Sequence, residues 1–197
     1  MSMALARCGN GSERREFSNS AASIVVDHGG CAMKGRGGAS AWLLLSLLVI
    51  VLDQSTKLLA LAKLAPYESR AVIDGLLDWT LAFNTGAAFS FLAAADGWQR
   101  WLFAALAVGI SCALIVWLTR LPRGDWRNAA PLALIIGGAL GNLIDRLRLG
   151  HVVDFIDVYW GNSHWPAFNI ADSAICVGAV MLIVFGLFAG KAADKRG

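Results

Sequence analysis

The sequence has few charged residues. Of its 197 residues, 16% are Asp, Glu, Lys or Arg, while 57% are hydrophobic and the mean hydropathy is +0.58. A soluble domain usually has about 25% charged residues, so the composition excludes an ordinary soluble domain and favours a chain that crosses a membrane several times. The net charge of +3 is not gathered into a basic face or tail, which argues against a nucleic-acid-binding protein.

The sequence also lacks the motifs of several common catalytic centres. It contains no G-x-S-x-G and no H-E-x-x-H, and its four cysteines show no metal-binding spacing. Cys112 and Cys176 lie inside apolar runs, where we expect them to act as small hydrophobic residues. His28 falls in a polar N-terminal arm, and His151 and His164 are expected to be surface or hydrogen-bonding residues. Aspartate remains as the candidate for chemistry.

Four apolar segments are long enough to cross a membrane, which takes about 20 helical residues. They cover about residues 41–64, 98–118, 128–147 and 170–189. The connection at 65–97 is rich in β-forming residues and predicts short strands, with a turn at Asn84-Thr85-Gly86. The predicted fold is therefore an α-helical polytopic membrane protein with four transmembrane helices and a small β-rich loop region.

The ends of the chain and the loops differ in charge. Residues 1–40 are polar and Gly/Ser-rich, and we expect them to be a disordered cytoplasmic extension. Met33 offers an ordinary start for a membrane protein, so residues 1–32 are interpreted as an addition to the working protein. Most Lys and Arg residues lie in this extension, between the second and third spans, and in the tail at 191–197. The positive-inside rule then places both termini in the cytoplasm and the loops at 65–97 and 148–169 outside.

The first span contains a polar interruption. Asp53 and Lys57 stand four residues apart, so they share a helix face and can form an ion pair. They have two compatible interpretations: a self-neutralised pair packed among helices, or a scaffold that orients a neighbouring site.

The third span ends in a polar helix face, and the fourth span begins with an acid. Gly137 and Gly141 form a G-x-x-x-G pattern that permits close helix packing. Asn142, Asp145 and Arg146 follow at helical spacing. The acid of the fourth span, Asp172, lies in its first turn. There Asp172 or the neighbouring Asn169 can cap the helix, which is an alternative to a functional role for the acid.

Two aspartates are the candidates for catalysis. Asp154 and Asp172 are each framed by apolar or aromatic residues, in VVDFI and FNIAD, at the same predicted membrane surface. Two carboxylates close together at a partly dry interface cannot both ionise cheaply, so one keeps a proton. Such a pair supplies a base that activates water and an acid that protonates a leaving amine, as in an aspartic protease. Asp157 is interpreted as solvated or structural.

Five motifs together resemble the lipoprotein signal peptidase family, also called signal peptidase II. They occur in the family's order within a four-span chain, over residues 41–190. They are DQSTK at 53–57, FNTGAAFS at 83–90, GNLIDR at 141–146, VVDF at 152–155 and PAFNIADS at 166–173. Only the N-terminal extension departs from the family pattern.

The resemblance implies an aspartic endopeptidase of the bacterial inner membrane, with its site at the periplasmic face. Its family substrate is a prolipoprotein that carries diacylglycerol on a cysteine, and the cut falls just before that cysteine. The resemblance further implies no metal or organic cofactor, contact with membrane lipid, inhibition by globomycin-type peptides and a monomeric protein.

The resemblance also assigns roles to individual residues. It implies that Asp154 and Asp172 form the catalytic pair. A substrate-binding polar shell is expected from Asn84, Gly86, Asn142, Arg146 and Asn169. Asp53, Lys57 and Asp145 are expected to support the site.

Two other classes of protein remain as alternatives. An ion-coupled transporter could use the intramembrane acids and the lysine, although the four spans show no internal repeat. A lipid-binding or assembly subunit would not need two acids brought together.

Overall fold

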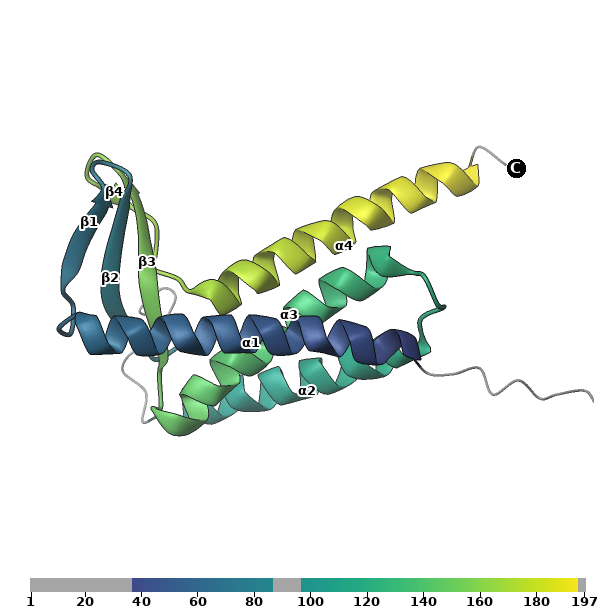
Figure 1. Ribbon diagram of the computed structural model, residues 1–197, viewed down its shortest axis with the longest axis horizontal. Helices are drawn as coiled ribbons and strands as arrows, with labels where there is room; N and C mark the ends of the chain where they lie inside the picture. Colours follow the sequence, from purple (N-terminus) through teal and green to yellow (C-terminus); the bar gives the residue numbers. More distant parts are fainter. Residues whose placement is uncertain (1–36, 87–96, 195–197) are drawn as a thin grey trace, which may run out of the picture. The chain divides into compact units, whose positions relative to one another are not determined.

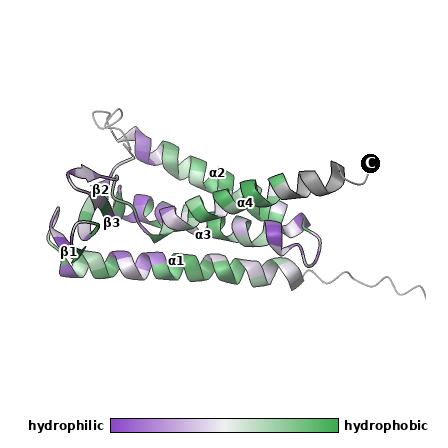
Figure 2. Ribbon diagram, turned by 90° about the horizontal axis from the view of Figure 1, so that it is seen from above, coloured by the Kyte–Doolittle hydropathy of each residue, from purple (hydrophilic) through white to green (hydrophobic). Residues whose placement is uncertain are grey.

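The computed structural model describes residues 37–86 and 97–194, which form four helices and four strands. The helices are α1 (Gly37–Lys63), α2 (Trp98–Arg120), α3 (Trp126–Arg148) and α4 (Ile170–Asp194). All four are long and apolar enough to cross a membrane, which confirms the predicted fold class. Figure 2 shows hydrophobic residues along most of each helix and hydrophilic residues in the sheet and in the helix ends beside it.

The helix boundaries differ from the expected ones by a few residues. The predicted disordered extension falls mainly on residues 1–36, which lie outside the described residues. Helix α1 begins at Gly37, so the last four residues of that extension are helical. Helix α3 begins at an N-cap, because the carboxylate of Asp125 accepts a hydrogen bond from the backbone N–H of Asn128 at 3.3 Å. Such a cap satisfies a backbone donor that the first helical turn leaves free.

Helix α3 is the centre of the bundle. It contacts each of the other three helices and carries the largest buried fraction among the four spans. Figure 1 shows it running between α1, α2 and α4. A central helix is the one place from which polar side chains can reach neighbours on several sides without facing lipid.

Glycines allow α3 to approach its neighbours closely. A Cβ atom at Gly137 would lie 2.8 Å from the carbonyl oxygen of Ser46 in α1. A Cβ atom at Gly138 would overlap the carbonyl oxygen of Ala171 in α4, and one at Gly141 would lie 2.8 Å from a carboxylate oxygen of Asp53. The G-x-x-x-G pattern therefore brings α3 against α1, and Gly138 brings it against α4.

A four-stranded antiparallel sheet stands at one end of the helices (Figure 1). Its order is β1 (Ser69–Ile73), β2 (Leu77–Asn84), β3 (Val152–Trp160) and β4 (Ser163–His164). Strands β1 and β2 confirm the strands expected in the connection at 65–97, of which residues 87–96 lie outside the described residues.

Strand β3 is not among the predicted elements, since the sequence predicts only an outer loop at 148–169. Its sequence, VVDFIDVYW, is dominated by β-branched and aromatic residues, which favour strands. It pairs with β2, so residues from two distant connections build one sheet. The pairing shifts register between Trp79 and Ala82, opposite Ile156 and Asp154, and such bulges re-aim the side chains beside them.

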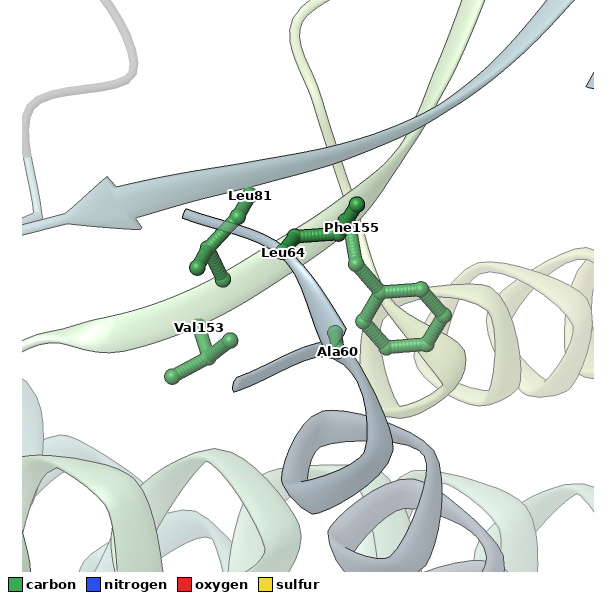
Figure 3. Packing of buried hydrophobic residues seen from close by; sticks show 5 residues of the cluster. All are labelled: Ala60, Leu64, Leu81, Val153 and Phe155. Carbon is green, nitrogen blue, oxygen red and sulfur yellow. The ribbon is translucent and has the colours of Figure 1, made fainter. Parts of the chain in front are cut away.

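An apolar cluster anchors the sheet to the end of α1. Figure 3 shows its members: Ala60 from α1, Leu64 directly after α1, Leu81 from β2, and Val153 and Phe155 from β3. Val153 is fully buried and Phe155 is 7% exposed. Asp154 lies between them on the chain, so the cluster holds the strand that carries this acid.

Replacing Gly138 should loosen the contact between α3 and α4. We expect Gly138→Ala to lower the melting temperature of the detergent-solubilised protein by several degrees, because overpacking of this kind costs about 1–3 kcal/mol. Gly109→Ala on α2 is the matched control, since a Cβ atom there meets nothing within 4 Å. Equal melting temperatures for the two variants would contradict this account of the helix contact.

Candidate active site

The two candidate acids lie near each other, one at the start of β3, which follows α3, and the other at the start of α4. Asp154 is the third residue of β3, and Asp172 lies in the first turn of α4. Strand β3 starts four residues after α3 ends at Arg148. The end of α3, the start of β3 and the start of α4 therefore converge on the two aspartates.

Asn169 caps α4 and contacts the first aspartate. Its side-chain oxygen accepts a hydrogen bond from the backbone N–H of Asp172 at 2.9 Å, so Asn169 is the N-cap that its position allowed. Its side-chain nitrogen donates to Oδ1 of Asp154 at 2.6 Å. The capping bond thus fixes the amide with its donor toward Asp154.

Asn142 holds the second aspartate from α3. Its side-chain nitrogen donates to Oδ1 of Asp172 at 2.7 Å. Its side-chain oxygen accepts from Asn169 at 3.2 Å and from Nζ of Lys57 at 2.9 Å. The two asparagines therefore form a bridge of amides that joins Asp154 to Asp172.

The surroundings of Asp154 strongly change the pKa of its carboxyl group. The residue is 2% exposed, and burial raises the pKa of its carboxyl group to about 7, with a further increase from the nearby carboxylate of Asp172. Hydrogen bonds from Asn84 and Asn169 and the charge of Lys57 act in the opposite direction. Near neutral pH the carboxyl group can therefore hold or release a proton, as a general acid or base must.

The predicted pair of Asp53 and Lys57 forms, and it is buried. Nζ of Lys57 lies 2.8 Å from Oδ2 of Asp53, with the two side chains 2% and 0% exposed. It also lies 2.8 Å from Oδ2 of Asp145 on α3. The polar interruption of α1 is thus part of an ionic cluster next to the two aspartates.

Gln54 belongs to the same cluster, although it was assigned no role from the sequence. Its side-chain nitrogen lies 2.9 Å from Oδ1 of Asp145 and 3.2 Å from the carbonyl oxygen of Gly141. Its place in the DQSTK interruption was the available signal, since a polar side chain inside a membrane span needs a partner.

The turn after β2 also reaches the site. The backbone N–H of Gly86 donates to the side-chain oxygen of Asn84 at 2.9 Å, which confirms the expected turn. Gly86 has a φ of 107°, and a Cβ atom there would overlap the ring of Phe103. Only glycine fits this position without strain.

Phe103 on α2 is a second residue without an assignment from the sequence. Its ring lies under the guanidinium of Arg146, 5.3 Å from the ring centre. Arg146 donates to the carbonyl oxygen of Asn142 at 3.3 Å and interacts electrostatically with both Asp154 and Asp172. Phe103 therefore connects the Gly86 turn to the cation beside the acids.

Other polar residues of the same loops lie apart from this constellation. Asp157, on β3, is 2.8 Å from Nδ1 of His164, whose ring stacks on Tyr159. His151 packs edge-on against the ring of Phe83. These contacts agree with the structural or hydrogen-bonding roles expected for Asp157 and the two histidines.

The raised pKa of Asp154 predicts a stability change with a definite sign. Between the ordinary aspartate pKa and about pH 7, the native carboxyl group holds a proton that the unfolded chain releases. Its contribution to the free energy of unfolding therefore falls as pH rises through this window. Asp154→Asn removes this loss of stability with rising pH. The difference in melting temperature between the variant and wild type should therefore be larger, in favour of the variant, at pH 8 than at pH 5.

Asp157→Asn, measured over the same pH series, separates an effect of Asp154 from the removal of any acid on β3. A melting temperature difference between Asp154→Asn and wild type that does not grow with pH would contradict the environment described for Asp154.

Comparison with known proteins gives a consistent family. The family model described as signal peptidase (SPase) II matches residues 45–188. A lipoprotein signal peptidase of Xanthomonas campestris pv. campestris (strain 8004) is 59% identical over 167 residues, covering 84% of this chain and 100% of the relative. A lipoprotein signal peptidase of Pseudomonas putida (strain KT2440) is 62% identical over 149 residues, covering 75% of this chain and 87% of the relative.

Solved structures agree with the sequence comparison. A bacterial membrane enzyme determined by the in meso method at 1.9 Å resolution superposes with a TM-score of 0.67 at 32% identity, covering 75% of this chain and 93% of the other. A second, at 2.3 Å resolution, gives a TM-score of 0.69 at 29% identity and covers 80% of this chain and 93% of the other. The chain therefore belongs to the signal peptidase II family and is a bacterial membrane protease.

Proposed function

We propose that this chain is an aspartic endopeptidase that removes the signal peptide from diacylglyceryl-modified prolipoproteins, cutting just before the lipidated cysteine. The observation that carries the proposal is the pair formed by the buried Asp154 and the half-buried Asp172, which the amides of Asn142 and Asn169 join. Membership of the signal peptidase II family supports the substrate class.

The hydrogen bonds indicate which oxygen atoms of the two carboxyl groups are available for acid and base catalysis. Oδ1 of each aspartate accepts a hydrogen bond from an asparagine amide, so the proton held by the pair belongs on one of the two Oδ2 atoms. The ionised carboxylate takes a proton from water, whose oxygen then attacks the scissile carbonyl carbon. The protonated carboxyl group gives its proton to the departing amine, and the C–N bond breaks.

The remaining polar residues are proposed to receive the substrate. Asn84, the last residue of β2, hydrogen-bonds the carboxyl group of Asp154, Gly86 follows in the turn after β2, and Arg146 lies beside the acids from α3. Together with Asn142 and Asn169 they would hold the extended segment around the scissile bond. Globomycin-type peptides would compete for the same groups. Asp53, Lys57 and Asp145 would support the site from within the bundle.

The position of the acids suits a substrate that is itself anchored in the membrane. Asp154 lies in the sheet and Asp172 at the start of a spanning helix, so the pair stands at one end of the bundle. We place this end at the periplasmic face of the inner membrane and both termini in the cytoplasm, from the distribution of Lys and Arg. The enzyme would act as a monomer in contact with lipid, and the proposed chemistry requires no cofactor.

Asp154→Asn and Asp172→Asn should each abolish cleavage. We expect kcat to fall by at least about 100-fold, because each variant removes general acid or base catalysis. The measurement is a gel shift of a diacylglyceryl-modified prolipoprotein incubated with purified protein in detergent. Mass spectrometry of the product reports whether the cut precedes the lipidated cysteine.

Asp157→Asn is the matched control, since it removes an acid from the same strand whose partner is His164. It should cleave at a rate close to wild type. Near-normal turnover by either Asp154→Asn or Asp172→Asn would overturn the assignment of the pair, and an inactive, folded wild type would overturn the proposed substrate.

The proposed orientation can be tested with single cysteines in a chain whose four native cysteines are replaced by serine. A membrane-impermeant maleimide added to spheroplasts should label Ser163→Cys, in the sheet, and not Arg123→Cys, between α2 and α3. Labelling of Arg123→Cys alone would place the site on the cytoplasmic side.

A further inference from the structure

The ammonium group of Lys57 uses all three of its donors on the framework of the acid pair. Nζ lies 2.8 Å from Oδ2 of Asp53, 2.8 Å from Oδ2 of Asp145 and 2.9 Å from Oδ1 of Asn142. The side chain is only 2% exposed. A lysine ammonium has three donors and no acceptor, so each contact fixes the partner as an acceptor in that direction.

The first contact leads to the start of α4. While Oδ2 of Asp53 faces Lys57, its Oδ1 accepts from the backbone N–H of Ala171 at 2.9 Å. Ala171 directly precedes Asp172. An acid on α1 thus binds a free backbone donor of α4, one residue before the second aspartate of the pair.

The second contact leads to the start of β3. Oδ2 of Asp145 faces Lys57 and also accepts from the backbone N–H of Val153 at 3.2 Å. Val153 directly precedes Asp154. The strand that carries the first aspartate is therefore attached to the same ammonium group through one carboxylate.

The third contact sets the direction of the Asn142 amide. Because Lys57 can only donate, it requires the side-chain oxygen of Asn142 on its side. The side-chain nitrogen then faces Asp172, to which it donates at 2.7 Å. A reversed amide would place an oxygen against the carboxylate and lose both contacts.

We propose that Lys57 is a positioning residue that sets the relative placement of the two catalytic aspartates, through Asp53 to α4, through Asp145 to β3 and through Asn142 to Asp172. This inference deepens the proposed function and rests on it. Lys57 acts through these three residues and has no direct role in bond breaking.

The charges around Lys57 give the inference a measurable signature. Asp53 faces it from its own helix, Asp145 from α3, Asp154 from β3 and Asp172 from α4. Arg146 is the second cation near the pair. Removing the charge of Lys57 should let Asp154 keep its proton to a higher pH, because that charge favours the ionised form.

The test is Lys57→Met, assayed for prolipoprotein cleavage beside wild type and Asp154→Asn. We expect kcat to fall by about 100-fold, because small misplacements of catalytic groups cost factors of this size, with KM within about threefold of wild type. The alkaline limb of the remaining activity should move to higher pH.

Ser46→Ala is the matched control for a purely structural effect. Ser46 is another buried polar residue of α1, and its hydroxyl donates to the carbonyl oxygen of Ala133 on α3 at 2.7 Å. It should lower the melting temperature while leaving kcat per folded enzyme and the pH profile unchanged.

Asn142→Asp tests the positioning role if the Lys57→Met variant does not fold. Aspartate at this position has the size of the native residue and can still accept from Lys57, but its ionised carboxylate repels the carboxylate of Asp172 instead of donating a hydrogen bond to it. We expect a folded protein with kcat lowered at least about tenfold, the loss typical of one hydrogen bond to a charged group.

The outcomes separate this inference from the proposed function. An inactive wild type, or an active Asp154→Asn, overturns the proposed function. If those two behave as proposed, a Lys57→Met or Asn142→Asp variant with wild-type kcat and an unmoved alkaline limb overturns the positioning role.

Discussion

The structure depends on one buried ammonium group. Lys57 lies inside a membrane span, where an isolated charge is costly, and it is stable there because two carboxylates and an amide oxygen surround it. Removing one partner of a buried ion pair costs about 3–5 kcal/mol, so α1, α3 and the segments tied to them are held in one arrangement. The same contacts that make the charge tolerable also bring the two aspartates together.

Close helix packing makes these contacts possible. An ammonium on α1 can meet a carboxylate on α3 only if the two helices nearly touch, and Gly137 and Gly141 remove the side chains that would keep them apart. Gly138 does the same for α3 and α4. In a lipid environment, such packing and polar contacts replace the hydrophobic effect as the force that joins helices. The ionic cluster therefore depends on the small residues of α3, which let the helices approach closely.

The site combines this rigid interior with a sheet at the membrane edge. Asp172 belongs to the bundle, whereas Asp154 belongs to a strand held by the apolar cluster around Val153 and Phe155. Burial makes ionisation of Asp154 unfavourable and raises its pKa to about 7, which is a cost for folding and a benefit for proton transfer. Under the proposed function, placing one acid in each layer puts the pair where a membrane-anchored peptide can leave its helical form and be attacked.

The sequence by itself determined the four spans, the strand-forming connection, the candidate aspartates and the family resemblance, because hydrophobic runs and short motifs are local properties of the chain. It also indicated that Asp53 and Lys57 pair, since four residues make one helical turn. Only the tertiary structure decided that Asp145 joins that pair, that β3 is a strand of the same sheet, and that Gln54 and Phe103 contact the residues of the site. These are contacts between segments tens of residues apart, and their partners are set by helix packing and strand register, which no local pattern of residues encodes.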